Sequence, residues 1–451
     1  MSNQDRIEKA LSVANQTKAL MIGPDIISEV GEMFKAQFPG RKAIIISNDS
    51  TFEAVGVKVA EALAASGVEQ DEPFIFTDPN LYAEFSYVLQ LDARLSRTRA
   101  IPVAVGAGTI NDLTKICSYR NGKRYMCVAT AASMDGYAAY GASITHNGEK
   151  KDFECPAPKA ILADTAIIAQ APSSLTAAGY ADLFAKITAG ADWILADELG
   201  VDHIDPFYWS IIQDGLITSL KNPKGIKDGN LEAIEPLVEG LILGGFAMQG
   251  LRSSRPASGA EHQFSHLWDM EKHTFEGHTP SHGFKVSIGM LAVTALYERM
   301  LNTDLSNLDV EAAVKAWPEA EDQAQELRQM FADSDFLSIA VNETMAKHIS
   351  KRELRRQLTM LKVKWPEIRE RLSRQLMPFS EVVRRLSLVG APTMPRQIGI
   401  TRTRLKESFR RAVCIRRRFT ILDVAVRTNM LDTWLDEIFG PGGMWEIGEI
   451  Q

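Results

Sequence analysis

The stretch Ile101–Cys117, IPVAVGAGTINDLTKIC, decides the fold of the first part of the chain. It begins as a β-branched run, passes through Gly106-Ala107-Gly108, and continues as a helix that we expect to begin near Thr109 or Asn111. A strand, a small-residue loop and a helix N-terminus together present free backbone N–H groups and a positive dipole end, which favour a phosphate or pyrophosphate. A tight turn that holds no ligand is the alternative explanation.

The loop departs from the common nucleotide-binding fingerprints. Asn111 stands where the third glycine of GxGxxG would be, and no GK[ST] follows, so we predict a dinucleotide site of another design. Asp49 lies just past the run AIIIS, where it can contact an adenosine ribose hydroxyl, although an Asp in a surface turn is the commoner explanation.

The wider pattern predicts an α/β domain followed by a helical one. Short β-branched runs alternate with helical stretches, which is typical of a parallel, Rossmann-like sheet covered by helices. The expected strands are Ala43–Ser47, Phe74–Thr77, Ile101–Val105, Tyr125–Ala129 and Ile161–Ala163. Asn147-Gly148 predicts a hairpin between Ile144 and Phe153. From Ser173 onward a 3.6-residue period dominates, so we expect domains at 1–172 and 173–451.

The composition narrows the class of protein. Of 451 residues, 45% are hydrophobic and 24% charged, which excludes a disordered chain. The cysteines Cys117, Cys127, Cys155 and Cys414 form no CxxC pair, so we expect reduced cytosolic thiols. The N-terminus lacks the pattern of a signal peptide, and Leu237–Leu251 is too short to span a bilayer. We expect a cytoplasmic protein without membrane insertion.

Positive charge is concentrated near the C-terminus. Lys347 to Arg418 contains 21 Lys and Arg against 5 Asp and Glu, although the whole chain has a net charge of −7. A basic patch for nucleic acid is one interpretation. We favour solvated faces of amphipathic helices, partly paired with acidic residues, because the Arg residues lie between regularly spaced apolar positions and no nucleic-acid-binding motif accompanies them.

Histidines gather in one segment. Five of eight lie between His262 and His282, and His262 and His266 are four residues apart, so they share one helix face. With a carboxylate they can complete a three-ligand metal site with one open position. The carboxylate candidate is Asp182, on an otherwise apolar helix. Surface histidines, and an Asp182 paired with Lys186, are the structural alternatives.

At this point the sequence resembles a known family, the sn-glycerol-1-phosphate dehydrogenases of the iron-containing alcohol dehydrogenase superfamily. That superfamily also contains glycerol dehydrogenase and 3-dehydroquinate synthase. The resemblance runs in order through nearly the whole chain, in the motifs VGAGTINDLTK, TAASMDGYA, AAGYADLFAK, SRPASGAEHQFSH, SHGFKVSIG, VGAPTMPRQIGIT and IRRRFTILD. It implies a dehydroquinate synthase-like fold, a nicotinamide dinucleotide, one divalent metal and a homo-oligomer.

The resemblance also implies roles for individual residues. Asp182, His262 and His282 match the metal ligands, and Asp182 is also near the substrate. Asp135 matches a substrate-contacting carboxylate, and His266 a substrate-binding histidine. The positions that match cofactor-binding segments are Gly108, Thr109, Ile110, Asn111, Asp112, Thr130, Ala131, Ala132 and Ser133, to which we add Gly106 and Asp49 from the residue patterns. His273 and His278 match no family role and are interpreted as loop residues.

Three positions depart from the family pattern. Ala139 replaces a serine that often contacts the cofactor, Ala107 replaces a glycine or serine, and Ser287 replaces a glycine. None of these removes a metal ligand.

The reaction that these residues imply is reversible reduction of dihydroxyacetone phosphate to sn-glycerol 1-phosphate by NADH or NADPH, with Asp182, His266 and Asp135 at the reacting centre. Zinc, nickel and ferrous iron all suit the ligand set. Asp49 mildly favours NAD over NADP.

We expect Arg255 to bind the substrate phosphate, with a structural salt bridge as the alternative. The rival functions are a glycerol or other polyol dehydrogenase, a dehydroquinate-synthase-like cyclase, and a non-catalytic dinucleotide- or nucleic-acid-binding module.

Overall fold

The computed structural model describes residues 3–146 and 149–447 of the chain, which divide into two compact units. Unit 1 comprises residues 1–184, 207–254 and 388–390, and unit 2 comprises residues 185–206, 255–387 and 391–451. The domain boundary that we predicted at residue 172 follows the change from mixed to helical structure. The compact units instead divide the chain at several places, because the segment 207–254 packs with the sheet.

Within the described residues, unit 1 is built on a six-stranded sheet in the order β1-β8-β5-β4-β2-β3, with every neighbouring pair parallel. Its strands are β1 (Ala19–Gly23), β2 (Ala43–Asn48), β3 (Phe74–Phe76), β4 (Ile101–Gly106), β5 (Met126–Ala129) and β8 (Ala160–Asp164). The predicted parallel α/β fold is confirmed. One strand, β1, was not predicted.

A separate antiparallel hairpin interrupts the parallel pattern, as the sequence predicted. It pairs β6 (Ala142–His146) with β7 (Glu149–Phe153), for example Ile144 opposite Lys151. The Asn147-Gly148 turn itself lies outside the described residues.

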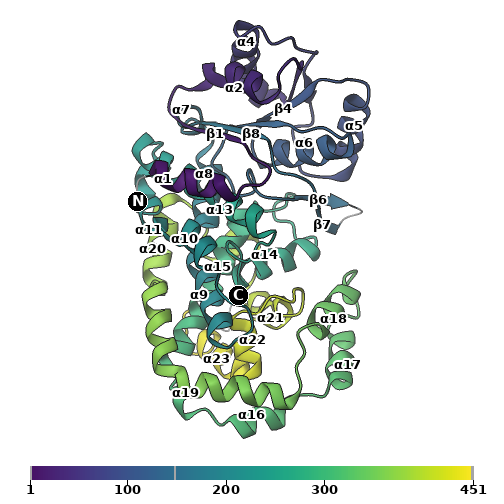
Figure 1. The fold of residues 1–451 in the computed structure, drawn as a ribbon. Helices are drawn as coiled ribbons and strands as arrows, with labels where there is room; N and C mark the ends of the chain where they lie inside the picture. The colour runs from purple at the N-terminus through teal and green to yellow at the C-terminus, as the bar shows by residue number, and fades with distance from the viewer. Residues whose placement is uncertain (1–2, 147–148, 448–451) are drawn as a thin grey trace. The chain divides into compact units, whose positions relative to one another are not determined.

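Both faces of the sheet are covered, which explains why its central strands read as continuous apolar runs. Ile45, Val103 and Val105 pack on α2 (Val30–Gln37) and α4 (Val57–Ala65). The helices α5 (Phe85–Leu95) and α6 (Gly108–Arg120) lie on the other side of the sheet (Figure 1). Unit 1 also contains α1 (Asn3–Val13), η1 (Ile27–Glu29), α3 (Asp49–Thr51), the π-helical turn η2 (Phe52–Gly56), α7 (Thr165–Ile168), α8 (Ser173–Phe184), α10 (Pro206–Gln213), α11 (Leu216–Ser219), α12 (Pro223–Lys227) and α13 (Leu231–Leu251).

Unit 2 is helical throughout its described part. The pair that matters most for function is α14 (Ala260–Met270) and α15 (His282–Asn302), which pack against each other. Around them are α9 (Lys186–Glu198), η3 (Leu305–Asn307), α16 (Val310–Ala316), α17 (Ala320–Met330), α18 (Leu337–Met345), α19 (Lys351–Gln375), α20 (Phe379–Val389), η4 (Pro395–Ile398), α21 (Arg402–Ala412), α22 (Ile421–Arg427) and α23 (Leu431–Phe439). Across the described chain, no helix is both long and apolar enough to cross a membrane.

The basic segment of unit 2 is largely neutralised by its own neighbours. Arg355 pairs with Glu311, Arg371 with Asp197 and Glu198, and Arg417 with Glu343. Further pairs join Arg356 to Glu353, Lys364 to Glu198, Arg374 to Glu370, Arg404 and Arg411 to Glu271, and Lys406 to Asp436. This pairing supports the structural explanation of the charge that we favoured.

Candidate functional site

The glycine loop of unit 1 joins β4 to α6 as the sequence predicted. The helix begins at Gly108 with Ala107 as its N-cap, and no side chain caps it, so its first N–H groups remain available to an anion. A Cβ on Gly106 would lie 2.6 Å from the side chain of Ile110. Only a glycine therefore lets the strand pass so close to the first turn of the helix.

The two segments predicted to bind the cofactor lie against each other. A Cβ on Gly108 would lie 2.5 Å from Cε of Met134, and the backbone N–H of Thr130 donates to the carbonyl of Gly106 over 3.3 Å. Behind them, α8 is in direct contact with the backbone of the second segment, because a Cβ on Gly179 would overlap the carbonyl oxygen of Ala132. These contacts bring together residues that are far apart in sequence.

Not every predicted cofactor residue has an accessible side chain. Ile110, Ala131 and Ala132 are buried, and Asn111 accepts a hydrogen bond from the Tyr125 hydroxyl over 3.0 Å. These residues shape the loop and present only backbone groups. Thr130 is buried, whereas Thr109, Asp112 and Ser133 are partly exposed and Asp49, the first residue of α3, is exposed.

A buried lysine of α6 binds the loop that follows the second segment. The Lys115 ammonium is fully buried and donates to the carbonyl oxygens of Gly136, Ala139 and Gly141 at 3.0, 3.1 and 2.8 Å. It also lies 3.5 Å from the carboxylate of Asp112. One cation thereby bonds three loop carbonyls, of which that of Gly136 also accepts from the Ala139 N–H over 3.4 Å. Sequence reasoning missed this role of Lys115, although the lysine lies inside the quoted motif.

Two predicted site residues of unit 1, Asp135 and Asp182, are joined by a hydrogen bond. Asp182 is completely buried on α8, and its Oδ2 accepts a hydrogen bond from the backbone N–H of Asp135 over 3.0 Å. A buried carboxylate is costly unless it is hydrogen-bonded or meets a positive charge. The hydrogen bond therefore fixes the Asp182 carboxylate next to the TAASMDGY segment.

The predicted histidines of unit 2 are also brought together. The ring centroids of His262 and His282 are 5.3 Å apart, and His266 lies 6.3 Å from each of them. His282 is the first residue of α15, whose N-cap Ser281 accepts from the Phe284 N–H. The close packing depends on Gly289, since a Cβ there would overlap the Glu261 carbonyl oxygen on α14.

Both ligand candidates on these helices have one ring nitrogen occupied by a protein group. Nδ1 of His262 lies 2.8 Å from Oε1 of Glu261, and Nδ1 of His282 lies 3.3 Å from the Ser265 hydroxyl. In each ring Nε2 is then the nitrogen suited to a metal.

Beside them, unit 2 buries two carboxylates that sequence reasoning missed. Asp192 accepts from the N–H groups of Ala260 and Ile421 and from the Tyr297 hydroxyl. Burial and the neighbouring Glu261 raise the pKa of Asp192. Burial also acts to raise the pKa of Glu261, but the hydrogen bond and charge of His262 and the Gly259 N–H outweigh it and lower the pKa.

The remaining histidines and the Ser287 departure have structural explanations. Buried His273 donates from Nε2 to the Ile398 carbonyl over 2.6 Å and accepts from Arg404 at Nδ1. His278 is exposed in the loop after α14, so the loop interpretation fits both. The Ser287 hydroxyl donates to the Pro392 carbonyl over 2.7 Å, a contact that glycine cannot make.

The geometry of Arg255 agrees with the structural alternative rather than with phosphate binding. Its side chain is 4% exposed, and each guanidinium nitrogen already faces a protein acceptor. Nε lies 3.1 Å from Asp202, Nη1 donates to the Phe419 carbonyl, and Nη2 donates to the Asp192 carbonyl. The expectation that Arg255 grips the substrate phosphate is therefore not supported.

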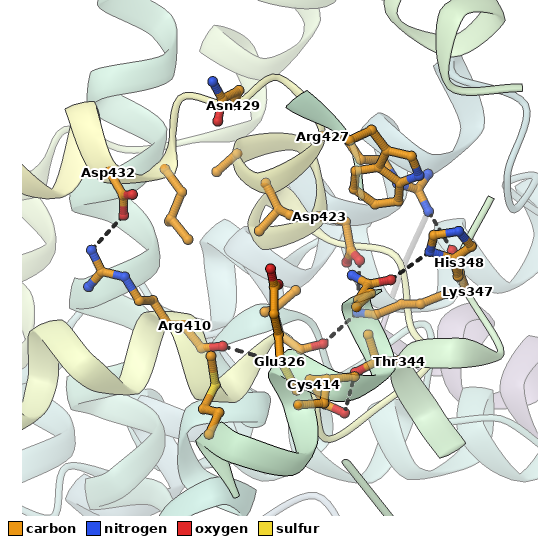
Figure 2. Close-up of a pocket in the computed structure, with 18 residues that line it drawn as sticks. Glu326, Thr344, Lys347, His348, Arg410, Cys414, Asp423, Arg427, Asn429 and Asp432 are labelled. Carbon is orange, nitrogen blue, oxygen red and sulfur yellow. Dashed lines mark hydrogen bonds and ion pairs between the residues drawn. The ribbon is translucent and has the colours of Figure 1, made fainter. Parts of the chain in front are cut away.

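A cavity of about 260 Å³ lies elsewhere in unit 2, between α17, α18, α21 and α22 (Figure 2). Its charged walls are paired: Lys347 bonds Asp423 over 2.7 Å, and Arg410 bonds Asp432 over 2.5 Å. Among the described residues that line it, none is a predicted site residue. The cavity is therefore separate from the histidine cluster.

Comparisons with known proteins assign the class. The family described as iron-containing alcohol dehydrogenase matches residues 21–172. A solved structure described as a probable glycerol dehydrogenase from Sinorhizobium meliloti 1021 has a TM-score of 0.58 at 16% identity, over 94% of this chain and 98% of that one. At that identity the match shows a shared fold.

Two curated relatives are closer in sequence. A glycerol-1-phosphate dehydrogenase of Halalkalibacterium halodurans is 34% identical over 56% of this chain and 64% of the relative. A glycerol-1-phosphate dehydrogenase of Methanosarcina mazei is 32% identical over 55% of this chain and 69% of the relative. The chain belongs to the iron-containing alcohol dehydrogenase family.

Membership of this family implies NAD(P) and a divalent metal, and the candidate ligands are Asp182, His262 and His282. The donor set fits such an ion, because it offers one buried carboxylate and two imidazoles whose Nδ1 atoms are already occupied.

Proposed function

We propose that this chain is a metal-dependent NAD(P)H oxidoreductase that reversibly reduces dihydroxyacetone phosphate to sn-glycerol 1-phosphate. The single observation that carries the proposal is the candidate ligand set Asp182, His262 and His282. The two relatives named as glycerol-1-phosphate dehydrogenases give the substrate class.

In this proposal Asp182, His262 and His282 hold one divalent cation, with zinc as our first choice. When bound, the cation supplies Lewis-acid polarisation of the substrate carbonyl, and the nicotinamide supplies the hydride. The Asp135 N–H keeps the Asp182 carboxylate in place, so that little reorganisation is needed before reaction.

The dinucleotide pyrophosphate lies, we infer, against the N-terminus of α6. Gly106, Gly108 and Thr109 offer backbone N–H groups there, and Thr130 to Ser133 form the adjoining wall. Exposed Asp49, past the end of β2, contacts the adenosine ribose. Its negative charge disfavours a 2′-phosphate and therefore favours NAD.

The substrate is oriented by side chains of the remaining predicted positions. His266 lies on α14 one turn after His262 and delivers the proton to the oxygen that gains negative charge during hydride transfer. Asp135 accepts a hydrogen bond from a substrate hydroxyl through its carboxylate.

One observation favours a second candidate, a dehydrogenase of unphosphorylated glycerol or another polyol. Because Arg255 is occupied by Asp202, Asp192 and Phe419, it does not supply the phosphate grip that we predicted. The substrate comparison therefore includes unphosphorylated dihydroxyacetone.

The proposal is tested by initial rates of NADH and NADPH oxidation with dihydroxyacetone phosphate. Chelator-stripped protein is compared before and after zinc, nickel or ferrous iron is added back. Metal-restored turnover that exceeds turnover with dihydroxyacetone supports the proposal. No turnover with any combination, despite cofactor binding, contradicts it and favours the cyclase or a non-catalytic role.

The cysteines and the family resemblance indicate the setting of the reaction. The four cysteines are buried and free, as suits the reducing cytoplasm. We propose a homo-oligomer on the family resemblance alone. Salt-dependent retention on heparin would favour the nucleic-acid-binding alternative, which the ion pairing of the basic segment disfavours.

A further inference from the structure

A buried glutamate stands directly behind one of the proposed metal ligands. Glu261 is fully buried in the first turn of α14, and its Oε1 lies 2.8 Å from Nδ1 of the adjacent His262. The same oxygen accepts from the Gly259 N–H over 2.6 Å, and the Thr188 hydroxyl lies 2.9 Å from Oε2. Two further groups, the Gly259 N–H and the Thr188 hydroxyl, therefore hold the carboxylate against the imidazole.

The backbone is built to let this carboxylate fold back on its own helix. A Cβ on Gly259 would lie 2.9 Å from Oε2 of Glu261 and 2.5 Å from Oδ2 of Asp192. Any side chain at Gly259 would thus displace the glutamate from its place beside the imidazole. The absence of a side chain at Gly259 therefore permits the rotamer of Glu261 that places its carboxylate beside the imidazole.

The chemistry of the contact determines which nitrogen of His262 is available. A carboxylate only accepts hydrogen bonds, so Nδ1 of His262 carries the proton and Nε2 keeps its lone pair. A carboxylate behind an imidazole also increases the basicity of the free nitrogen and fixes the plane of the ring. The second ligand, His282, has only a neutral hydroxyl behind it, that of Ser265 at 3.3 Å.

We propose that Glu261 is a positioning residue that orients His262 and holds it in the tautomer that binds the metal through Nε2. This inference rests on the proposed function, because it requires that His262 is a ligand. The inference adds a residue that is not itself a ligand: Glu261 increases the affinity for the metal through its contact with His262, and not merely by being buried.

The experiment measures zinc affinity without turnover. Full-length, chelator-stripped wild type and variants are titrated with zinc in competition with a chromophoric chelator, and the unfolding temperature of each metal-free protein is recorded. Glu261→Met preserves volume and removes the acceptor, and Glu261→Gln restores an acceptor without the charge. Asp192→Asn is the matched control, since Asp192 is a second buried carboxylate of the same region that does not bond His262.

We expect Glu261→Met to weaken zinc binding about 10- to 100-fold, the range typical of lost outer-shell partners, and Glu261→Gln to recover part of that loss. Asp192→Asn should lower the unfolding temperature and leave the zinc Kd within about twofold of wild type, because no outer-shell partner of a ligand is lost. If Glu261→Met does not fold, Glu261→Asp takes its place, because the shorter side chain keeps the charge and withdraws the oxygen from Nδ1.

Each other outcome is decisive. Wild-type zinc affinity in Glu261→Met, or in Glu261→Asp where it replaces it, overturns the positioning role. An equal loss of affinity in Asp192→Asn overturns it too, since general destabilisation would then explain both. If the wild type binds no zinc, the metal site of the proposed function is itself contradicted. The wild-type titration alone gives this result, so it is not confused with the two results from the variants.

Discussion

The backbone N–H of Asp135 donates a hydrogen bond to Oδ2 of Asp182 over 3.0 Å, and so joins the TAASMDGY segment to α8. Asp182→Asn keeps an oxygen for this bond and removes the charge proposed to face the metal. We expect turnover to fall at least about 100-fold, as for loss of a principal electrostatic contact, with an unfolding temperature close to wild type. Steady-state NADH oxidation and thermal unfolding check this, and near-normal turnover would exclude Asp182 as a ligand.

Lys115 provides a second prediction, about stability and cofactor binding together. Lys115→Met leaves the carbonyls of Gly136, Ala139 and Gly141 without their buried donor. We expect the free energy of unfolding to fall by about 3 kcal/mol and the NADH Kd to rise. The matched control is Lys58→Met on the exposed face of α4, which should change stability by less than about 0.5 kcal/mol. Equal effects of the two variants in denaturant titrations would refute the anchoring role.

Gly289 allows the prediction that helix spacing determines metal affinity. Gly289→Ala places a methyl group against the Glu261 carbonyl and forces α15 away from α14. We expect a cost of about 1 to 3 kcal/mol in the free energy of unfolding, together with weaker zinc binding. Gly23→Ala in β1 is the control, because its nearest neighbour, Ile26, would lie at an ordinary 3.8 Å. The idea fails if Gly289→Ala retains wild-type affinity for zinc.

Glu381 predicts one contribution to acid sensitivity. Hydrogen bonds from Arg384 and then Arg385, at 2.7 and 2.6 Å, lower the pKa of Glu381 from 4.5 to about 2. A carboxyl whose folded-state pKa is depressed stabilises the fold above its unfolded pKa, and this stabilisation is lost as pH falls from about 4.5 towards 2. Glu381→Gln should therefore flatten the acid limb of a stability–pH curve, and an unchanged slope would show that the pairs contribute nothing.

The sequence predicts the sheet best where strands are buried on both faces. The runs AIIIS and IPVAV are continuous and β-branched because helices cover both sides of β2 and β4. The strand β1, ALMIG, was missed because it is an edge strand, only partly buried, and contains one β-branched residue. No local pattern distinguishes such a segment from the start of a helix.

Site residues divide in a similar way between chemistry and packing. His262, His266 and His282 were recognisable because histidines are rare and here clustered. Glu261 was not, because a single acidic residue near a helix start is also expected from the helix dipole alone. Its contact with His262 depends on the path of the backbone at Gly259, which only the structure provides. For the same reason the motif SRPASGAEHQFSH could not reveal that Arg255 forms an ion pair with Asp202.

The compact units are not continuous in sequence, and this has a consequence for how the chain can be made. Residues 207–254 belong with the sheet, although 185–206 belong with the other unit. A fragment cut at residue 172, where the strands end, would lack α8 and α13 and expose the faces of the sheet unit that they cover. During synthesis the segment 207–254 of the first unit leaves the ribosome only after residues 185–206 of the second have emerged. No single cut in the sequence therefore yields the two units as separate modules.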